Sequence, residues 1–177
     1  YRKAILLKPG DRIAVSKPRI FDMETLTEVS FSDELFSTPW SISDEHWAPD
    51  SSEFYFLYNE RGHGVMRLIG VNPATGEVRA VIDDDPETFF DYNAKLYLRY
   101  LDATDEVIWM SERDGWNHLY LIDRRTGAVK NQITKGEWVV RGVDALDVEK
   151  REMRLRVSGY YPDQDPYFVH YMRVSLD

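Results

Sequence analysis

The feature that most constrains the fold is a strand–turn–strand unit that occurs three times along the chain. In its clearest copy, residues 106–112 lead into a turn at Asp114-Gly115 and residues 118–123 lead out of it. Apolar and aromatic residues fill both segments, and an Asp-Gly pair between two such segments is a strong β-hairpin signal. The chain is therefore expected to be built from β-hairpins.

The spacing of the three copies defines a long repeat. Glu106 has one counterpart 53 residues upstream, Glu53, and another 46 residues downstream, Glu152. A second turn, Thr75-Gly76, recurs as Thr126-Gly127. A period of about 40–50 residues with four short strands per unit is typical of a β-propeller, whose stacked sheets bury each other's faces. No helical periodicity of useful length competes with this pattern.

The sequence therefore predicts an all-β fold, a partial β-propeller of about three to four blades, each a four-stranded antiparallel sheet. The expected bounds are an incomplete blade over about residues 4–31 and blades over about 41–83, 97–134 and 139–177, all within one segment of a propeller domain. Propellers close with about 4–8 blades, and open sheet edges are liabilities. We therefore expect a segment of a larger propeller, or a ring completed by another chain.

Several segments carry individual predictions. Residues 12–15 are expected to form a strand, and residues 32–45, rich in Ser, Asp, Glu and Pro, a surface loop. In the connection before the third blade, Gly136 is expected to permit a positive φ and Trp138 to cover the junction. Three further aromatic residues are expected to pack between blades: Trp47, Tyr100 and Trp109.

Composition excludes several classes of function. The formal net charge is −9 and the basic clusters are short, so the basic surface that nucleic acid requires is missing. The chain has no cysteine and hence no disulfide, thiolate zinc site or cysteine nucleophile. No apolar run approaches the length of a membrane span, and the apolar stretch near the N-terminus is too short for a signal peptide. A first residue other than Met suggests a chain cut from a longer one.

No metal or cofactor site is predicted. The run Asp83-Asp84-Asp85 with Glu87 could bind a divalent cation through oxygen ligands. A solvated acidic loop is favoured, because calcium-loop spacing is absent and Pro86 interrupts the run. The histidines are scattered and are interpreted as structural: His46, His63, His118 and His170.

Two stretches of the chain are distinctive beyond the repeat, and Trp47-Ala48-Pro49-Asp50 supports them. The two stretches are Ser111-Glu112-Arg113-Asp114-Gly115-Trp116-Asn117-His118-Leu119-Tyr120 and Ile133-Thr134-Lys135-Gly136-Glu137-Trp138-Val139-Val140-Arg141-Gly142-Val143. Through them the chain resembles the N-terminal propeller domain of dipeptidyl peptidase IV-type serine peptidases, in the prolyl oligopeptidase clan. The resemblance covers about residues 12–177, is strongest from 97 to 148, and indicates a bacterial member.

The resemblance implies a propeller that caps a C-terminal α/β-hydrolase domain, gates the active site and helps to position peptide substrates. The hydrolase domain supplies the Ser-Asp-His triad, and peptides, that domain and a second copy in a homodimer are the implied partners. This chain has no Gly-x-Ser-x-Gly motif, since Val157-Ser158-Gly159 lacks the first glycine. No catalytic residue is assigned: the chain alone is not expected to be an enzyme, whereas the parent is expected to be a serine-type dipeptidyl peptidase of the periplasm or cell envelope.

Six residues are candidates for contact with substrate, and each has a plainer structural interpretation as hairpin ion pairing or packing between blades. They are Phe89, Phe90, Glu112, Arg113, Asp114 and Trp116. Two alternative functions stay open at this point. One is a stand-alone propeller that binds a protein or a glycan. The other is a propeller glycosidase, which needs two converging carboxylates such as Glu112 and Asp144.

Overall fold

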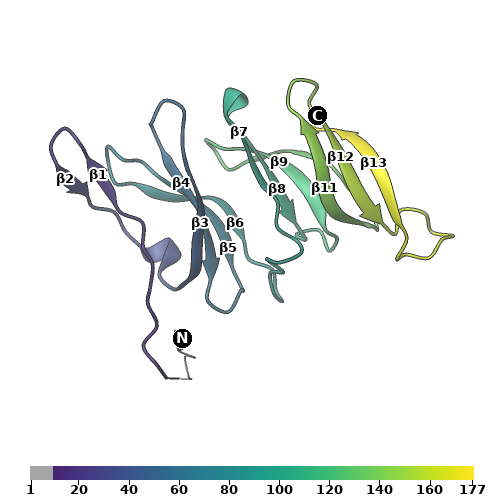
Figure 1. Ribbon diagram of the computed structural model, residues 1–177, viewed down its shortest axis with the longest axis horizontal. Helices are drawn as coiled ribbons and strands as arrows, with labels where there is room; N and C mark the ends of the chain where they lie inside the picture. The colour runs from purple at the N-terminus through teal and green to yellow at the C-terminus, as the bar shows by residue number, and fades with distance from the viewer. Residues whose placement is uncertain (1–9) are drawn as a thin grey trace, which may run out of the picture.

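The computed structural model describes residues 10–177 and is all β, as predicted (Figure 1). Within these residues thirteen strands form four antiparallel sheets, which follow one another along the chain. The three larger sheets stack face to face as the blades of a partial propeller (Figure 1).

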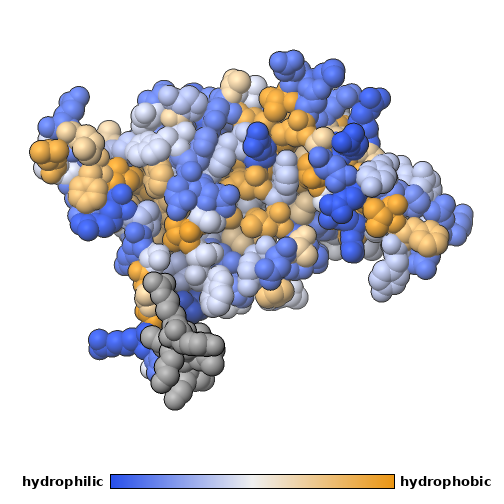
Figure 2. Space-filling model, in the orientation of Figure 1, coloured by the Kyte–Doolittle hydropathy of each residue, from blue (hydrophilic) through white to orange (hydrophobic). Residues whose placement is uncertain are grey.

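The first sheet is a short hairpin of β1 (Ile20–Asp22) and β2 (Thr27–Val29), followed by the 3-10 helix η1 (Glu34–Phe36). The strand expected at residues 12–15 is not formed, and these residues are exposed. The start of the incomplete blade, residues 4–9, lies outside the described residues. Figure 2 shows hydrophobic side chains on the surface of this hairpin, at the left of the view, where three residues are half exposed or more: Phe21, Met23 and Leu26.

Blade 1 contains β3 (Pro39–Trp47), β4 (Phe54–Glu60), β5 (Met66–Val71) and β6 (Val78–Asp84), in that spatial order. The surface loop predicted for residues 32–45 is therefore wrong from Pro39 onward. The nine residues of β3 pair with β4 along their length, with register shifts on both sides of the Ser41–Ser43 stretch. An edge strand needs only one partner, so its backbone pairing overrides the polar composition that suggested a loop.

Blade 2 contains β7 (Leu98–Leu101), β8 (Glu106–Ser111), β9 (His118–Asp123) and β10 (Val129–Gln132), with the 3-10 helix η2 (Asp102–Thr104) between its first two strands. All six residues of β8 are buried. A strand buried on both faces is what blade stacking requires, because each face packs against a different neighbour.

Blade 3 contains β11 (Val139–Asp147), β12 (Glu152–Ser158) and β13 (Val169–Ser175). It has three strands within the described residues, whereas four were expected. In the connection that precedes it, Gly136 has a φ of +125°, and the Trp138 ring packs edge-on against His118 at 4.9 Å between centroids. The connection therefore has the roles that its sequence predicted.

Two apolar clusters hold the blades together. One lies between blades 1 and 2 and contains the fully buried Trp109, with Tyr100 packed partly buried against it. The other lies between blades 2 and 3. The prediction that Trp47 packs between blades is wrong: its side chain is 44% exposed and contacts Phe54 of its own blade, with 5.0 Å between ring centroids. Trp47 is the last residue of β3, and it lines a shallow cavity with residues of the β1–β2 hairpin such as Phe21 and Val29.

The recurring Thr-Gly turns bring each blade close to the preceding unit. Gly76 has a φ of +74° and lies against the backbone of Ser30, while Gly127 has a φ of +75° and lies against the backbone of Val81. A side chain on either glycine would meet a backbone carbonyl, so glycine is required for the close approach as well as for the conformation.

Replacing Gly127 by alanine should cost about 1–2 kcal/mol for the left-handed conformation alone, and more because a Cβ would lie 2.6 Å from the Val81 carbonyl oxygen. Gly115→Ala is the matched control, since Gly115 has a φ of +93° and nothing within 4 Å of its Cβ position. Urea unfolding of both variants measures the difference. Equal losses of stability would show that the approach to Val81 does not matter.

Candidate functional site

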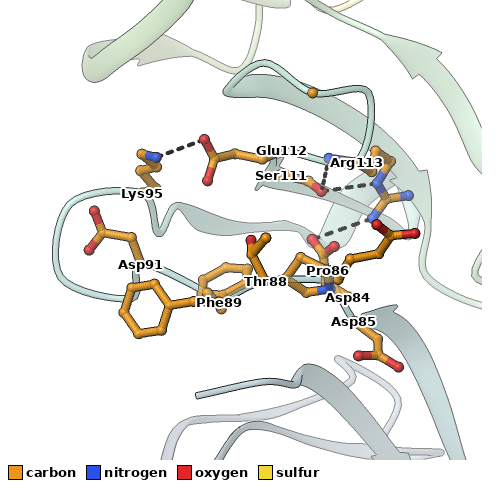
Figure 3. A pocket seen from close by; sticks show the side chains of 13 residues that line it. Asp84, Asp85, Pro86, Thr88, Phe89, Asp91, Lys95, Ser111, Glu112 and Arg113 are labelled. Atoms are coloured by element: carbon orange, nitrogen blue, oxygen red, sulfur yellow. Dashed lines mark hydrogen bonds and ion pairs between the residues drawn. The ribbon is translucent and has the colours of Figure 1, made fainter. Parts of the chain in front are cut away.

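A cavity of about 520 Å³ lies where the connection between β6 and β7 meets the turn between β8 and β9 (Figure 3). Both segments leave their sheets at the same end of the stack, because β6 and β8 each run toward that end. The lining residues are Asp84, Asp85, Pro86, Glu87, Thr88, Phe89, Phe90, Asp91, Lys95, Ser111, Glu112, Arg113 and Gly115.

The fold brings four of the six sequence-predicted candidates into this cavity, namely Phe89, Phe90, Glu112 and Arg113. The other two do not line it. Asp114 accepts a hydrogen bond from Gln132 Nε2 at 2.5 Å and one from the backbone N–H of Trp116 at 3.1 Å. Asp114 is therefore held within the hairpin, and the Trp116 ring is 40% exposed.

The two phenylalanines have different roles. Phe90 is buried against Trp109, with 6.0 Å between ring centroids, and its backbone N–H donates to the His63 carbonyl at 2.8 Å. This bond ties the connection to the turn between β4 and β5. Phe89 is 50% exposed and meets the His63 ring edge-on at 6.2 Å. Phe90 thus anchors the segment, and Phe89 offers a free aromatic surface to the cavity.

Arg113 is held at the opposite wall by several contacts. Its Nε donates to Ser111 Oγ at 3.1 Å, and its Nη2 lies 3.7 Å from Asp84 Oδ2 (Figure 3). Its Cζ atom is 4.9 Å from the centroid of the Tyr120 ring, a cation–π contact. Burial is the main cause that raises the pKa of Tyr120 to about 12, and the negative charge of Asp114 adds to it. The phenol therefore stays protonated at neutral pH.

The acidic run is only in part the solvated loop that was expected, because Asp83, Asp85 and Glu87 are exposed and Asp84 is buried. Asp83 and Asp84 end strand β6, and Asp84 is 6% exposed. Its Oδ2 accepts a hydrogen bond of 2.7 Å from Trp109 Nε1. The alternation of side chains along a strand could have predicted this burial. Asp84 is two residues beyond the buried Ile82, so both side chains point to the same side of the sheet. Asp85 and Glu87 line the cavity without an ion-pair partner among residues 10–177.

A second ion pair completes the site. Lys95 Nζ donates to Glu112 Oε1 at 2.7 Å across the other side of the cavity (Figure 3). Nothing in the sequence marked Lys95 or Ser111 as site residues, because both are brought in by the path of the connection. Carboxylates outnumber cations in the lining, so the cavity favours a positively charged group beside the Phe89 ring.

Of the two carboxylates considered for a glycosidase, only Glu112 lines the cavity. Glu112 lines the cavity in blade 2, whereas Asp144 belongs to blade 3 and accepts from Arg156 Nε at 2.8 Å. Among the described residues no group of three or more His, Cys, Asp or Glu is placed to hold a metal ion. His118 is fully buried and bonds Thr134 Oγ1 and the Gly136 carbonyl, both at 2.9 Å, so its role is structural.

Comparison with known proteins decides the family. The model of the family described as Dipeptidyl peptidase IV (DPP IV) N-terminal region matches residues 8–177. The chain belongs to this family. This match to the DPP IV N-terminal region confirms the resemblance that residues 111–120 and 133–143 indicated.

Two solved structures show the same fold as this DPP IV N-terminal chain. A protein of Bacteroides ovatus provisionally classed as a dipeptidyl aminopeptidase IV is 19% identical, with a TM-score of 0.56 over 86% of this chain and 23% of its own. The dipeptidyl peptidase 4 of Porphyromonas gingivalis is 18% identical, with a TM-score of 0.62 over 81% of this chain and 20% of its own. The chain therefore spans less than a quarter of either protein. No helix in residues 10–177 is both long and apolar enough to cross a membrane.

Proposed function

We propose that this chain is a non-catalytic propeller segment of a dipeptidyl peptidase IV-like serine peptidase, in which it gates the active site and helps to position peptide substrates. Family membership supports the parent enzyme, and the cavity between the β6–β7 connection and the β8–β9 turn supports the positioning role. The triad belongs to a C-terminal α/β-hydrolase domain outside these residues.

The chemistry of the cavity suits a peptide. A peptide with a free N-terminus carries a positive charge, which the excess of carboxylates favours. Phe89 supplies apolar contact for a substrate side chain, and the fixed pairs Lys95–Glu112 and Arg113–Asp84 hold polar groups in place for hydrogen bonding to the peptide backbone. Such a wall contributes by orienting the substrate, with no covalent step of its own.

Replacing Phe89 by alanine in the full-length protein is expected to raise KM for a dipeptidyl substrate about tenfold and to leave kcat unchanged. Covering a phenylalanine side chain is worth about 1.5–3 kcal/mol, and each 1.4 kcal/mol is a factor of ten. Contact made equally in the ground state and the transition state changes KM alone. Steady-state kinetics with a chromogenic dipeptide amide measures both constants.

Phe168→Ala is the matched control, because Phe168 is 56% exposed and lies in the loop between β12 and β13, away from the cavity. Equal KM values for the two variants would refute the positioning role. A full-length protein that releases no dipeptide and instead binds a protein or glycan would favour the stand-alone binding module.

A further inference from the structure

The face of blade 3 that points away from blade 2 carries arginines at a position where the other blades are apolar, beside the exposed Tyr171 and Val169 of β13. Under the repeat that equates Glu53, Glu106 and Glu152, the position of Tyr55 in β4 is that of Ile108 in β8 and Arg154 in β12. Tyr55 packs between blades 1 and 2, and Ile108 packs between blades 2 and 3. Arg154 is exposed. The apolar contact that this position makes at the two earlier junctions is therefore not available at the next.

The strand register concentrates charge on this face. Arg154 stands directly opposite Arg173 of β13, and like charges in that position repel each other. Arg154 has no hydrogen-bond or ion-pair partner among residues 10–177. The Arg173 side chain is 78% exposed, and its Nη1 is 3.9 Å from Glu152 Oε2, the limit of an ion pair. The two guanidinium groups thus form a cationic pair with unused donors.

Arg156, on the same face, is already held within the blade. Its Nε donates to Asp144 at 2.8 Å, and its guanidinium lies over Gly142, where a Cβ would come within 2.7 Å of Nη2. The unused binding capacity therefore belongs to Arg154 and Arg173.

We propose that Arg154 and Arg173 together receive a carboxylate from a neighbouring β-sheet of the same, longer protein, which stacks on blade 3 as blade 3 stacks on blade 2. This goes beyond the positioning role above. This chain spans less than a quarter of each structural neighbour. A longer protein of that size has enough further residues to form such a sheet. An apolar sheet would strip water from two unpaired charges without replacing the lost hydration, which is unfavourable. A carboxylate between two guanidinium forks forms charge-assisted hydrogen bonds and removes the repulsion.

The first test is Arg154→Met in the full-length protein, followed by thermal unfolding and by hydrogen exchange of the β12 and β13 amides. An acidic neighbour predicts a lower unfolding temperature and faster exchange, because its carboxylate loses a partner. An apolar neighbour predicts the reverse, since methionine restores the pattern of Ile108. A raised or unchanged unfolding temperature would overturn the proposal. Arg99→Met, at an exposed position on β7, is the matched control and should change neither readout.

The second test identifies the partner. In the Arg154→Lys variant of the full-length protein, a carbodiimide joins the new amine to a carboxylate within contact distance, and mass spectrometry of the peptides locates the link. The proposal expects a link to an Asp or Glu outside this chain's 177 residues but in the same molecule. Mixing isotopically light and heavy protein separates this result from a link to a second copy. A link to a second copy, a link only to Glu152, or no link would each overturn the proposal.

Discussion

Replacing Trp109 by alanine is expected to lower the free energy of unfolding by about 3–5 kcal/mol. The side chain is fully buried in the cluster between blades 1 and 2, where it packs against Phe90. Removing it leaves a cavity in the core and deprives the buried Asp84 of its 2.7 Å hydrogen bond. Equilibrium unfolding in urea, monitored by circular dichroism, measures the loss, and a change below about 1 kcal/mol would show that Trp109 is not part of the core.

Two companion variants separate packing from hydrogen bonding. Trp109→Phe keeps an aromatic ring and removes the donor, so we expect about 1–3 kcal/mol from the hydrogen bond that the buried Asp84 carboxylate loses. Trp116→Ala is the surface control, since that ring is 40% exposed and lies outside the apolar clusters. Its effect should stay within about 0.5 kcal/mol. A loss at Trp116 equal to that at Trp109 would contradict the assignment of the core.

Replacing Glu106 by glutamine should cost about 3 kcal/mol at neutral pH. The Glu106 side chain is 2% exposed and accepts from Arg151 Nη1 at 2.9 Å, from Thr104 Oγ1 at 2.6 Å and from Lys130. Arg151 precedes β12, so this carboxylate joins blade 2 to blade 3. Breaking a buried pair costs about 3–5 kcal/mol, and the lower end applies here because both cations reach solvent.

The same carboxylate predicts a pH dependence of stability. Burial pushes the pKa of Glu106 upward, but hydrogen bonds from Arg151, Lys130 and Thr104 outweigh it and hold the pKa below its ordinary value of 4.5. The unfolded chain therefore takes up the proton first as the pH falls. The contribution of Glu106 is complete above pH 4.5 and is lost as the pH falls through the lower, folded-state pKa.

Urea unfolding of the wild type and of Glu106→Gln between neutral and acidic pH tests both statements. The difference in unfolding free energy should shrink below pH 4.5. Glu152→Gln is the matched control, since Glu152 has the equivalent place in blade 3 but is 38% exposed and lies 3.9 Å from Arg173. Its effect should be below about 1 kcal/mol. A difference for Glu106→Gln that is constant with pH would contradict the buried ion pairing.

Local signals in the sequence predicted most of the fold. The hairpin around Gly115 and its counterpart around Gly62 depend on turn chemistry within a few residues, and both glycines have the positive φ that such turns need. The repeat of apolar strands predicted stacked sheets, since a two-sided apolar strand such as β8 cannot be stable alone. The part of β3 before His46 was taken for a loop, because its pairing with β4 overrides a polar composition.

The candidate site depended more on tertiary structure. The sequence selected Phe89, Phe90, Glu112 and Arg113, and the fold brings them to one cavity. It did not distinguish Phe90, which packs in the core, from Phe89, which faces the cavity. Asp84 was taken for a solvated residue, although its partner Trp109 is 25 residues away in the next blade.

The sequence by itself determined the hairpins, the repeat and the family, because turn residues and strand alternation act over short distances along the chain. Only the tertiary structure decided which charges are buried and which are left open. Glu106, Glu152 and Arg154 look alike in the sequence as charged residues of β-strands, yet one is enclosed between blades and the others face outward. The physical reason is that burial of a strand face depends on the sheet stacked against it, and that sheet comes from a distant part of the chain.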